Sequence, residues 1–329
     1  MYYRKKYGKG FTYQDANGNT IKDRKVRRWI EKLVIPPAWT AVEISSDTEA
    51  DLLVTGRDAK CRKQYIYHPD YVERRQQQKF NRIVRFASRL ERMRRVTGQH
   101  LRAKTYNRNK VLACMVRLLD LAYFRPGSAR YTEENETYGL TTMRSRHLEI
   151  EDDELTFHYI GKSGKEQERQ IADARLAKII QELDDIPGYR IFKYFDEDGT
   201  KQYVDSTDLN AYIKEVMGED FSAKDFRTWA GTMIAAVALD ELGVCDPKDQ
   251  NTMDERIRAA VVQVSERLGN TPAVAKSSYI DPRVIEQYMD GKTATYFSEQ
   301  IDQIFAVHEH LSIEELGVLC LLKSKMQAT

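Results

Sequence analysis

Four side chains suited to chemistry at a phosphate lie far apart in the sequence: Arg125, Lys162, Arg227 and Tyr279. A tyrosine phenol can act as a covalent nucleophile, but with a pKa of about 10 it is a poor one near neutrality and needs cations around the reaction centre. The guanidinium groups of Arg125 and Arg227 suit two non-bridging phosphate oxygens. A lysine beside other cations can have a lowered pKa and can then protonate a leaving oxygen. Together the four indicate transesterification at a phosphate, provided that the fold brings them together.

Each of these residues alone has a plainer explanation. An arginine at a helix end is most often a surface cation or a cap. A tyrosine beside proline most often packs in a core or at its rim, and Lys162 alone is a solubilising residue at a loop tip. The specificity of the set therefore depends on the segments around its members.

The segment around Tyr279 carries clear helix start and stop signals. An apolar helical run over 259–268 ends at Gly269, a residue suited to closing a helix in the left-handed region. Thr271 and Pro272 then predict the cap and first position of a new helix, because proline loses no needed hydrogen bond there. Tyr279 falls near the end of that second helix, before Asp-Pro stops it.

The elements that would position the other three residues are mainly helical. Apolar periodicity predicts helices over 109–123, 172–182, 206–217, 223–242 and 253–268. Ser312 and Glu315 form a capping-box signature that starts a last helix over 313–323. Strands over 148–150, 155–160 and 167–171 predict an antiparallel sheet whose hairpin tip carries Lys162 and Lys165.

The stretch 78–95 is amphipathic and carries six arginines. It predicts a helix, and three interpretations of its basic face stay open. The face contacts a nucleic acid, the helix links two domains, or the face is simply solvated.

Residues 1–77 predict a small β-rich domain. Asn17-Gly18 suits a hairpin turn, because it supplies the positive φ angles that such turns need. Short strands are expected over 41–44, 51–55 and 63–69, with a helix over 26–33. In the strand 63–69 we expect one of Tyr65 and Tyr67 to point inward to the core and the other outward.

The net charge of +2 hides a strong asymmetry. Residues 1–110 hold 27 Lys and Arg against 11 Asp and Glu, a net +16, and the remainder holds 25 against 39, a net −14. A basic first third favours a polyanionic partner held from that side, although a solvated basic face has the same composition.

Several classes of protein are disfavoured. No apolar run is long enough to span a bilayer, and the N-terminus lacks the apolar region of a signal peptide. The four cysteines are scattered and the six histidines form no ligand cluster, so we expect reduced thiols, a cytosolic protein and no metal site.

The ordered motifs resemble those of the type IB DNA topoisomerases, most closely the small bacterial and poxvirus-like enzymes. The order is Arg125, Lys162, Lys224-Asp-Phe-Arg227, then Leu268-Gly-Asn-Thr-Pro and Ser278-Tyr279. Further blocks of the family are similar to residues 35–40, 55–58, 63–69, 131–142 and 161–165. The resemblance covers about 35–282, and accidental agreement over six ordered blocks is improbable.

The resemblance implies an α+β fold with two lobes around duplex DNA. The expected lobes are a β-rich clamp domain at 1–77 and a mainly helical catalytic domain at 78–329 with a three-stranded antiparallel sheet. It also implies a monomer without an obligate protein partner or membrane association, acting on double-stranded DNA in the cytoplasm at the nucleoid. The implied activity is relaxation of supercoils without ATP or Mg²⁺, so we expect no cofactor.

The resemblance also assigns roles to the dispersed residues. Tyr279 would form a 3′-phosphotyrosyl link, Arg125 and Arg227 would bind the phosphate, and Lys162 would be the general acid, with Lys165 as the fallback. Many relatives carry a histidine where this chain has Asn270. An amide donates a hydrogen bond but does not titrate near neutrality, so we expect Asn270 to stabilise the transition state or to cap a helix, which are compatible roles.

Further DNA contacts are expected in both domains. Gln64 and Tyr65 are expected to contact DNA by resemblance. The phosphate-contact candidates are Arg57, Lys63, Arg74 and Arg75, with Lys165 and Lys224 in the catalytic domain.

Two alternatives remain. Tyrosine site-specific recombinases share the Arg, Lys, Arg, Tyr chemistry, but they usually carry a histidine where this chain has Lys224. A non-catalytic DNA-binding protein is the other, and the presence of all four chemical groups argues against it.

Overall fold

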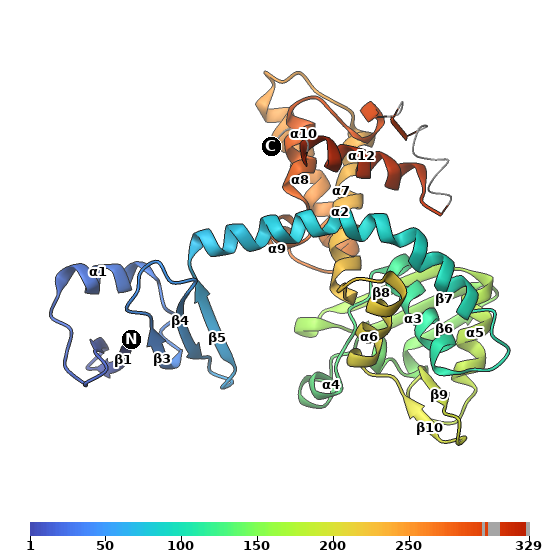
Figure 1. The fold of residues 1–329 in the computed structure, drawn as a ribbon, viewed down its shortest axis with the longest axis horizontal. Helices are drawn as coiled ribbons and strands as arrows, with labels where there is room; N and C mark the ends of the chain where they lie inside the picture. Colours follow the sequence, from blue (N-terminus) through green and yellow to red (C-terminus); the bar gives the residue numbers. More distant parts are fainter. Residues whose placement is uncertain (298–299, 302–309, 327–329) are drawn as a thin grey trace. The chain divides into compact units, whose positions relative to one another are not determined.

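The computed structural model describes every residue except 298–299, 302–309 and 327–329. The chain divides into two compact units, Met1–Asn81 and Arg82–Thr329 (Figure 1). Helix α2 (Pro69–His100) spans this division, and the boundary that the sequence predicts after residue 77 also falls within this helix.

The first unit is a five-stranded antiparallel sheet with one helix. The strands are β1 (Tyr2–Tyr7), β2 (Gly10–Gln14), β3 (Thr40–Ile44), β4 (Leu52–Arg57) and β5 (Lys63–Tyr67), in the order β2-β1-β3-β4-β5. Helix α1 (Arg24–Lys32) begins at Asp23, whose carboxylate accepts the backbone N–H of Lys25. It packs Ile30 against the apolar side chains of β3 and β4.

The turn predicted at Asn17-Gly18 is confirmed, and a further hairpin turn precedes it. Gly8, at φ +56°, lies in the turn between β1 and β2, so residues 2–7 form a strand that the sequence did not indicate. Asn17-Gly18 lies in a second tight turn, closed by a bridge between Gln14 and Thr20.

The expectation for the two strand tyrosines is wrong. Tyr65 and Tyr67 are 45% and 39% exposed and their rings stack, with centroids 5.9 Å apart. Residues two apart in a strand point to the same face of the sheet, so Tyr65 and Tyr67 must both point inward or both point outward. Ile66, between them, packs against the core instead.

The second unit is mainly helical around one continuous apolar core. Its principal helices are α3 (Arg108–Ala122), α5 (Ala174–Asp184), α6 (Ser206–Met217), α7 (Ala223–Leu242), α8 (Gln250–Leu268), α9 (Pro272–Ser278), α10 (Pro282–Met289) and α12 (Ile313–Met326). Most of α7 is buried, because α3, α6, α8, α10 and α12 all pack against it. The α+β class, with a β-rich N-terminal unit and a larger helical one, is confirmed.

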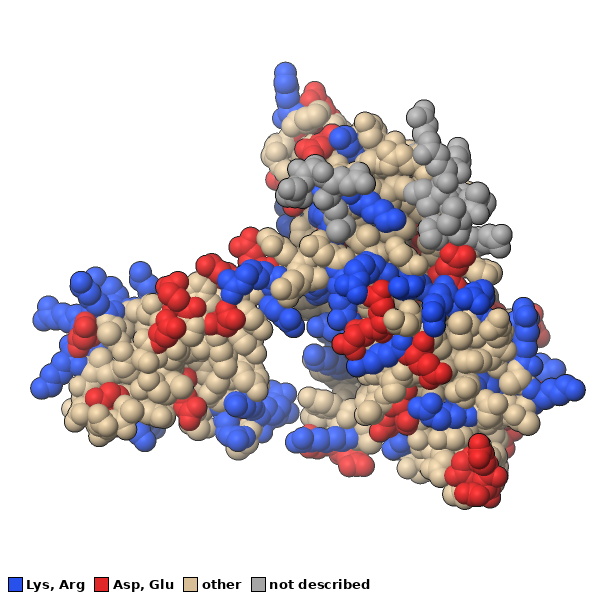
Figure 2. Space-filling view, viewed as in Figure 1, with Lys and Arg blue, Asp and Glu red and all other residues tan. Residues whose placement is uncertain are grey.

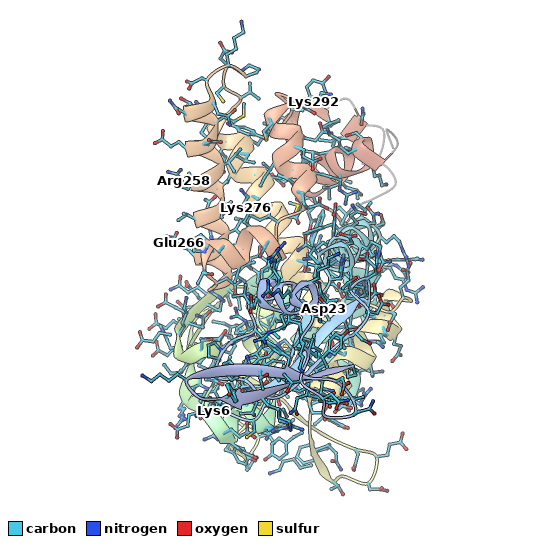
Figure 3. The ribbon with its side chains drawn as sticks, turned by 90° about the vertical axis from the view of Figure 1, so that its left-hand side faces the viewer. Lys6, Asp23, Arg258, Glu266, Lys276 and Lys292 are labelled. Carbon is cyan, nitrogen blue, oxygen red and sulfur yellow. The ribbon has the colours of Figure 1, made fainter. Side chains whose placement is uncertain are left out.

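Local patterning explains several of these elements. Helix α8 buries an apolar stripe that includes Ile257, Val264 and Leu268, while Arg258 and Glu266 point away from the helices (Figure 3). The capping box at α12 is confirmed, since Ser312 Oγ accepts the N–H of Glu315 at 3.2 Å and the Glu315 carboxylate accepts the N–H of Ser312 at 2.9 Å.

A three-stranded antiparallel sheet covers part of this core. Strands β6 (Leu148–Glu151), β7 (Glu154–Ile160) and β8 (Glu166–Ala172) pair in sequence order, as predicted, and the tip of the β7–β8 hairpin carries Lys162 and Lys165. Helix α10 was not predicted, and neither were two further elements. They are the short helix α4 (Ala129–Asn135) and the hairpin of β9 (Lys193–Phe195) and β10 (Lys201–Tyr203).

Helix α2 extends beyond the predicted 78–95 at both ends, and its arginines are largely fastened to the second unit. Basic side chains follow the helix with acidic ones among them (Figure 2). Arg94 bonds Asp120 at 3.0 Å and Glu315 at 2.6 Å, and so joins α2 to α3 and α12. The other pairs are Arg82 with Asp225, Arg85 with Glu219 and Arg89 with Glu219, and Arg92 donates to Val216 O. These contacts favour a structural role for this basic face.

Candidate active site

Arg227 lies at the centre of the candidate site. It sits in the first half of α7 and is only 2% exposed. Its Nη1 donates to Tyr123 O at 2.5 Å and its Nη2 to Leu268 O at 2.7 Å. These carbonyls end α3 and α8, where the helix dipoles concentrate negative partial charge. One buried guanidinium thus joins the ends of two helices.

Arg125 follows the first of these helix ends by two residues. Tyr123 closes α3 in the left-handed region at φ 58°, which turns the chain sharply. Phe124 is fully buried, with its ring edge-on to Phe157 at 5.2 Å and stacked on Tyr159 at 5.9 Å. The anchored ring on one side and the Arg227 contact on the other fix where Arg125 leaves the core.

The segment after Arg125 is locked by a close approach of two glycines. A Cβ on Gly139 would lie 2.5 Å from the Cα of Gly127, so neither position accepts a side chain without a backbone shift. The N–H of Leu140 donates to Arg125 O at 2.9 Å beside this contact. The sequence block 131–142 therefore supports the backbone of Arg125.

Asn270 follows the other helix end by two residues. Gly269 closes α8 at φ 62°, and Thr271 Oγ1 accepts the N–H of Val274 at the start of α9, with Pro272 at the first position. The predicted helix stop and start are therefore confirmed. A Cβ on Gly269 would lie 2.3 Å from Gln167 Oε1, so strand β8 packs directly on this turn.

The amide of Asn270 has an orientation that its neighbour dictates. Arg125 Nη2 donates to Asn270 Oδ1 and, at 3.3 Å, to Gly269 O. A guanidinium can only donate, so the amide oxygen must face Arg125 and the Nδ2 group must face away from it. Among the described residues, the buried Nδ2 has no hydrogen-bond partner. Asn270 therefore holds a spare donor beside Arg125.

Tyr279 reaches Arg227 because α7 carries a glycine one turn further on. Gly231 lies against Tyr279, and a Cβ on Gly231 would lie 2.7 Å from both the Cβ and the carbonyl oxygen of Tyr279. Thr232 Oγ1 donates to Tyr279 O and accepts the N–H of Asp281, both at 3.2 Å. Arg227 and Gly231 share a helix face, and the Arg227 Cζ lies 5.3 Å from the centre of the Tyr279 ring.

The charges of the cluster lower the pKa of the Tyr279 phenol. Burial opposes ionisation of Tyr279, but the charges of Arg227, Arg125 and Lys224 and a hydrogen bond from Arg227 outweigh it, so its pKa is lowered. Burial, followed by repulsion from Arg125, lowers the pKa of Arg227 to about 10. Arg227 therefore stays charged near neutrality, beside a phenol that ionises more easily than a free one.

Lys162 and Lys165 are not part of this cluster. Both are exposed at the tip of the β7–β8 hairpin, in a turn with Ser163 at φ 67° and Gly164 at φ 72°. Within the described part of the chain, no hydrogen bond or ion pair joins either side chain to the other predicted site residues. The base of the hairpin does reach the site, since Gln167 packs against both Gly161 and Gly269.

A polar layer behind the site was missed by the sequence. Arg169 Nη2 donates to Gln167 Oε1 at 2.9 Å, and burial lowers the Arg169 pKa while the nearby charge of Arg125 adds to the effect. Burial raises the pKa of Tyr159 beside it. The available signal was strand alternation, which places Gln167, Arg169 and Ile171 on one face of β8.

In the first unit, several predicted DNA-contact residues share a face. Arg57 and Lys63 are register partners across β4 and β5, as are Thr55 and Tyr65, so their side chains lie on the exposed side of the sheet. The Lys63 Nζ lies 5.6 Å from the centre of the Tyr65 ring. This face combines cations with an aromatic surface.

The remaining predicted residues of this unit have local partners or none. Gln64 Nε2 donates to Asp58 Oδ2 at 2.9 Å, and Arg57 Nη1 to Cys61 O at 2.9 Å. Arg74 pairs with Asp51 at 2.6 Å. Arg75 is exposed, and no ion pair to it exists in the part of the chain that the structure describes.

Neither a membrane-spanning helix nor a metal-ligand cluster occurs among the residues that the structure describes. No helix there is long and apolar enough to cross a membrane. No group of three or more His, Cys, Asp or Glu side chains among them could hold a metal ion. The four cysteines are unpaired.

The site thus gathers three cations and an amide around a tyrosine, and comparisons with known proteins show the family of the chain. The family described as "Eukaryotic DNA topoisomerase I, catalytic core" matches residues 67–305. The family described as "Bacterial DNA topoisomerase IB, N-terminal domain" matches residues 10–58.

Relatives from viruses match most of the chain. The DNA topoisomerase 1B of Acanthamoeba polyphaga mimivirus is 32% identical over 294 residues, which covers 88% of each protein. The DNA topoisomerase I of Monkeypox virus is 24% identical over 304 residues, or 89% of this chain and 93% of the viral protein. The chain belongs to the type IB DNA topoisomerases, a family of isomerases, and to its small subfamily.

Proposed function

We propose that this chain relaxes supercoiled double-stranded DNA by cutting and resealing one strand through a 3′-phosphotyrosyl intermediate at Tyr279. The observation that carries the proposal is the convergence of Arg125, Arg227 and Asn270 around a tyrosine whose pKa is lowered. The family membership supports the same substrate and reaction.

The proposed step exchanges one phosphodiester for another. The Tyr279 oxygen bonds to phosphorus, its proton passes to solvent, and the bond from phosphorus to the 5′-oxygen breaks. The leaving oxygen takes a proton and becomes a 5′-hydroxyl. The cut strand then rotates, and the same hydroxyl attacks the phosphotyrosine to restore the original bond. Since the number of ester bonds is conserved, we propose that ATP is not required.

Arg125 and Arg227 are proposed to bind the two non-bridging oxygens of the scissile phosphate. Their hydrogen-bond partners are backbone carbonyls, the Asn270 amide and the Tyr279 phenol, so no carboxylate among the described residues neutralises their charge. A preorganised donor of this kind is worth roughly 10²–10³ in rate. Asn270 Nδ2, the buried donor without a partner, is proposed to complete the set. With these groups at the phosphate, we propose that no metal ion takes part.

Lys162 is proposed as the general acid for the 5′-oxygen, with Lys165 as the fallback. The proposal requires the hairpin tip to approach the phosphate when DNA binds. Gly164 supports it, because nothing lies within 4 Å of where its Cβ would be, which leaves the tip open. Lys224 is proposed to contact the DNA backbone beside the scissile phosphate, since its charge is close enough to lower the Tyr279 pKa.

The first unit is proposed to contact the duplex through its exposed sheet face. Tyr65 and Gln64 are the proposed contacts by family resemblance. The phosphate contacts proposed beside them are Arg57, Lys63, Arg74 and Arg75. The shared face of Arg57, Lys63 and Tyr65 supports this assignment.

We also propose that the protein acts as a monomer in the cytoplasm, at the nucleoid, without an obligate protein partner. The converging groups all come from one chain, so the site needs no residue from a second copy. Light scattering of the purified protein, with and without a short duplex, measures its oligomeric state.

Relaxation of a supercoiled plasmid in EDTA without ATP tests the proposed activity. We expect the parental protein to relax the plasmid and Tyr279→Phe to bind DNA without relaxing it. Tyr296→Phe is the matched control, since that tyrosine is exposed and outside the site. Relaxation by Tyr279→Phe at the parental rate would refute the proposal. A parental protein that binds the plasmid without relaxing it would refute it as well.

Mapping the trapped adduct tests the chemistry directly. Denaturation during the reaction should leave the protein on the 3′ phosphate of the cut strand, with a free 5′-hydroxyl. Attachment to the 5′ end would contradict the proposed step. Site-specific recombinants among the products would instead favour the recombinase alternative.

A further inference from the structure

A second basic surface of the second unit combines cations with tyrosines in alternation. Arg144 Cζ lies 5.4 Å from the Tyr138 ring centre and 5.5 Å from that of Tyr189. Arg190 Cζ lies 5.7 Å from the Tyr189 ring centre and 5.4 Å from that of Tyr203. Arg146 at one end and Lys201 at the other extend the row. We call this row the cation–tyrosine ladder: Arg146, Tyr138, Arg144, Tyr189, Arg190, Tyr203 and Lys201.

The ladder is assembled from segments that are distant in the sequence, and hydrogen bonds hold it in place. Arg146 Nη2 donates to the Tyr138 hydroxyl at 2.7 Å. Lys201 Nζ donates to Pro187 O at 2.8 Å, so the β9–β10 hairpin is tied to the loop before Tyr189. The rings of Tyr189 and Tyr203 lie 5.7 Å apart. The side chains are therefore positioned before any ligand arrives.

The cations of the ladder are not neutralised. In the part of the chain that the structure describes, no carboxylate forms an ion pair with Arg144, Arg146, Arg190 or Lys201. Acidic side chains do gather at the outer end of the β9–β10 hairpin (Figure 2). One of them, Asp196, is engaged there by Thr200 N and Gln202 Nε2, both at 2.8 Å. The acidic tip thus bounds the ladder without pairing with it.

The ladder is connected to the candidate active site through the chain. The N–H of Tyr138 donates to Ile160 O at 2.8 Å, at the base of the hairpin that carries Lys162. The next residue, Gly139, packs on Gly127 in the loop that follows Arg125. The segment that carries Tyr138 thus also supports the loop of Arg125 and the base of the Lys162 hairpin.

The chemistry of the ladder fits phosphates better than bases. Each inner tyrosine ring already has a cation over it, so a base that stacks on the ring would compete with that cation. A guanidinium stacked on a ring keeps its N–H edge for oxygen acceptors such as phosphate. Tyr189 is 57% exposed, which places this row at the surface.

We propose that the cation–tyrosine ladder binds the phosphate backbone of duplex DNA and extends the enzyme's contact with the duplex beyond the scissile phosphate. The inference rests on the proposed function for its substrate. It adds a binding surface on the β9–β10 hairpin and the loops at 138–146 and 189–190, none of which carries the chemistry.

The test is the salt dependence of binding to a fluorescent duplex of defined length. The ladder variant is Arg144→Ala/Arg190→Ala/Lys201→Ala. The matched control is Lys178→Ala/Lys248→Ala/Arg258→Ala, which removes the same charge from exposed cations elsewhere in the unit. We expect the slope of log affinity against log salt to fall by about 0.9 for each phosphate that the variant no longer binds, and affinity near 0.1 M salt to fall by roughly tenfold or more. The control should keep the parental slope.

Equal slopes for the ladder variant, the control and the parental protein would overturn the proposal. Arg144→Lys/Arg190→Lys keeps the charge and should retain most of the slope, and a loss as large as that of the alanine variant would also count against a phosphate contact. Thermal melting confirms that each variant is folded. Parental relaxation with unchanged slopes would defeat the ladder alone. If the ladder variant has a smaller slope than the parental protein but the parental protein does not relax DNA, the proposed activity alone is refuted.

Discussion

The arginines of α2 and those of the candidate active site differ in the partners that they bind. Most of the α2 arginines bond carboxylates, and Arg94 bonds two of them, Asp120 and Glu315. Arg125 bonds Gly269 O and the amide oxygen of Asn270, and Arg227 bonds two backbone carbonyls and the Tyr279 phenol. Among the residues that the structure describes, neither arginine bonds a carboxylate. The Arg94 side chain is itself largely buried, so burial does not separate the two sets.

The difference shows how the same side chain serves two purposes. A carboxylate cancels the charge of a guanidinium, and the pair then fastens two elements together. A carbonyl or amide oxygen fixes the geometry of a guanidinium and leaves its charge for an incoming anion. The number of arginines in a segment is therefore a poor guide to nucleic-acid contact, and the partners decide.

The largest effect, on stability, is expected from removing an α2 arginine that bonds carboxylates. Arg94→Ala leaves the poorly solvated Glu315 without its ion-pair partner and leaves Asp120 with Arg117 alone. The free energy of unfolding should therefore fall by about 3–5 kcal/mol. Urea unfolding measures the change. Arg85→Ala is the control, since that pair is more exposed and should cost less than about 1 kcal/mol. Equal losses in the two variants would contradict the fastening role.

Removing the central arginine should be next in size. Arg227→Ala should slow single-turnover cleavage of a duplex by roughly 10²–10³. The side chain also joins the ends of α3 and α8, so some loss of stability should accompany the loss of rate. Arg85→Ala should cleave close to the parental rate per folded molecule. A comparable fall in rate for both variants would abolish the distinction between the two sets.

A sharper test gives an active-site arginine the kind of carboxylate partner that the α2 arginines have. Asn270→Asp replaces the amide that accepts from Arg125 by a carboxylate of nearly the same shape. We expect thermal stability to hold or rise, because a charge-assisted bond is stronger than a neutral one. Cleavage should slow by about tenfold or more, since the charge of Arg125 is offset and the Nδ2 donor is removed. A parental cleavage rate would show that neither the charge nor the donor matters.

The smallest effect is expected in the pH dependence of cleavage. The pKa of Tyr279 is lowered, so the rate should rise with pH and level off below the value of about 10 expected for a free phenol. It should fall again as Arg227, with a pKa of about 10, loses its charge. Lys224→Ala removes one of the cations that lower the Tyr279 pKa, so the rising limb should move to higher pH. A rising limb unmoved by that change would exclude Lys224 from the electrostatics of the phenol.

Local patterns in the sequence predicted most helices and the whole of the Tyr279 segment. Gly269, Thr271 and Pro272 act within one or two turns of chain, so their effect does not depend on distant contacts. The same holds for the capping box at Ser312 and for the three strands of the second sheet. The family could be predicted from the sequence for a related reason. Each of its motifs is a short local segment, and their order is visible in the sequence.

Other features depend on pairs of residues that the sequence separates widely. Gly231 matters because Tyr279 packs on it, and Gly139 because Gly127 does. The layer of Gln167 and Arg169 was missed because a polar strand face looks solvated until a turn packs on it. The expectation that Tyr65 and Tyr67 point to opposite faces was wrong for a simpler reason. Side chains alternate along a strand, so residues two apart point to the same face.

The sequence by itself determined the reactive groups, their order and the helix ends that carry them, because these follow from residue type and short-range geometry. Only the tertiary structure decided which cations keep their charge. That property depends on which oxygen atoms lie opposite each guanidinium, and those oxygens come from residues up to about 220 positions away along the chain, as in the pair of Arg94 with Glu315.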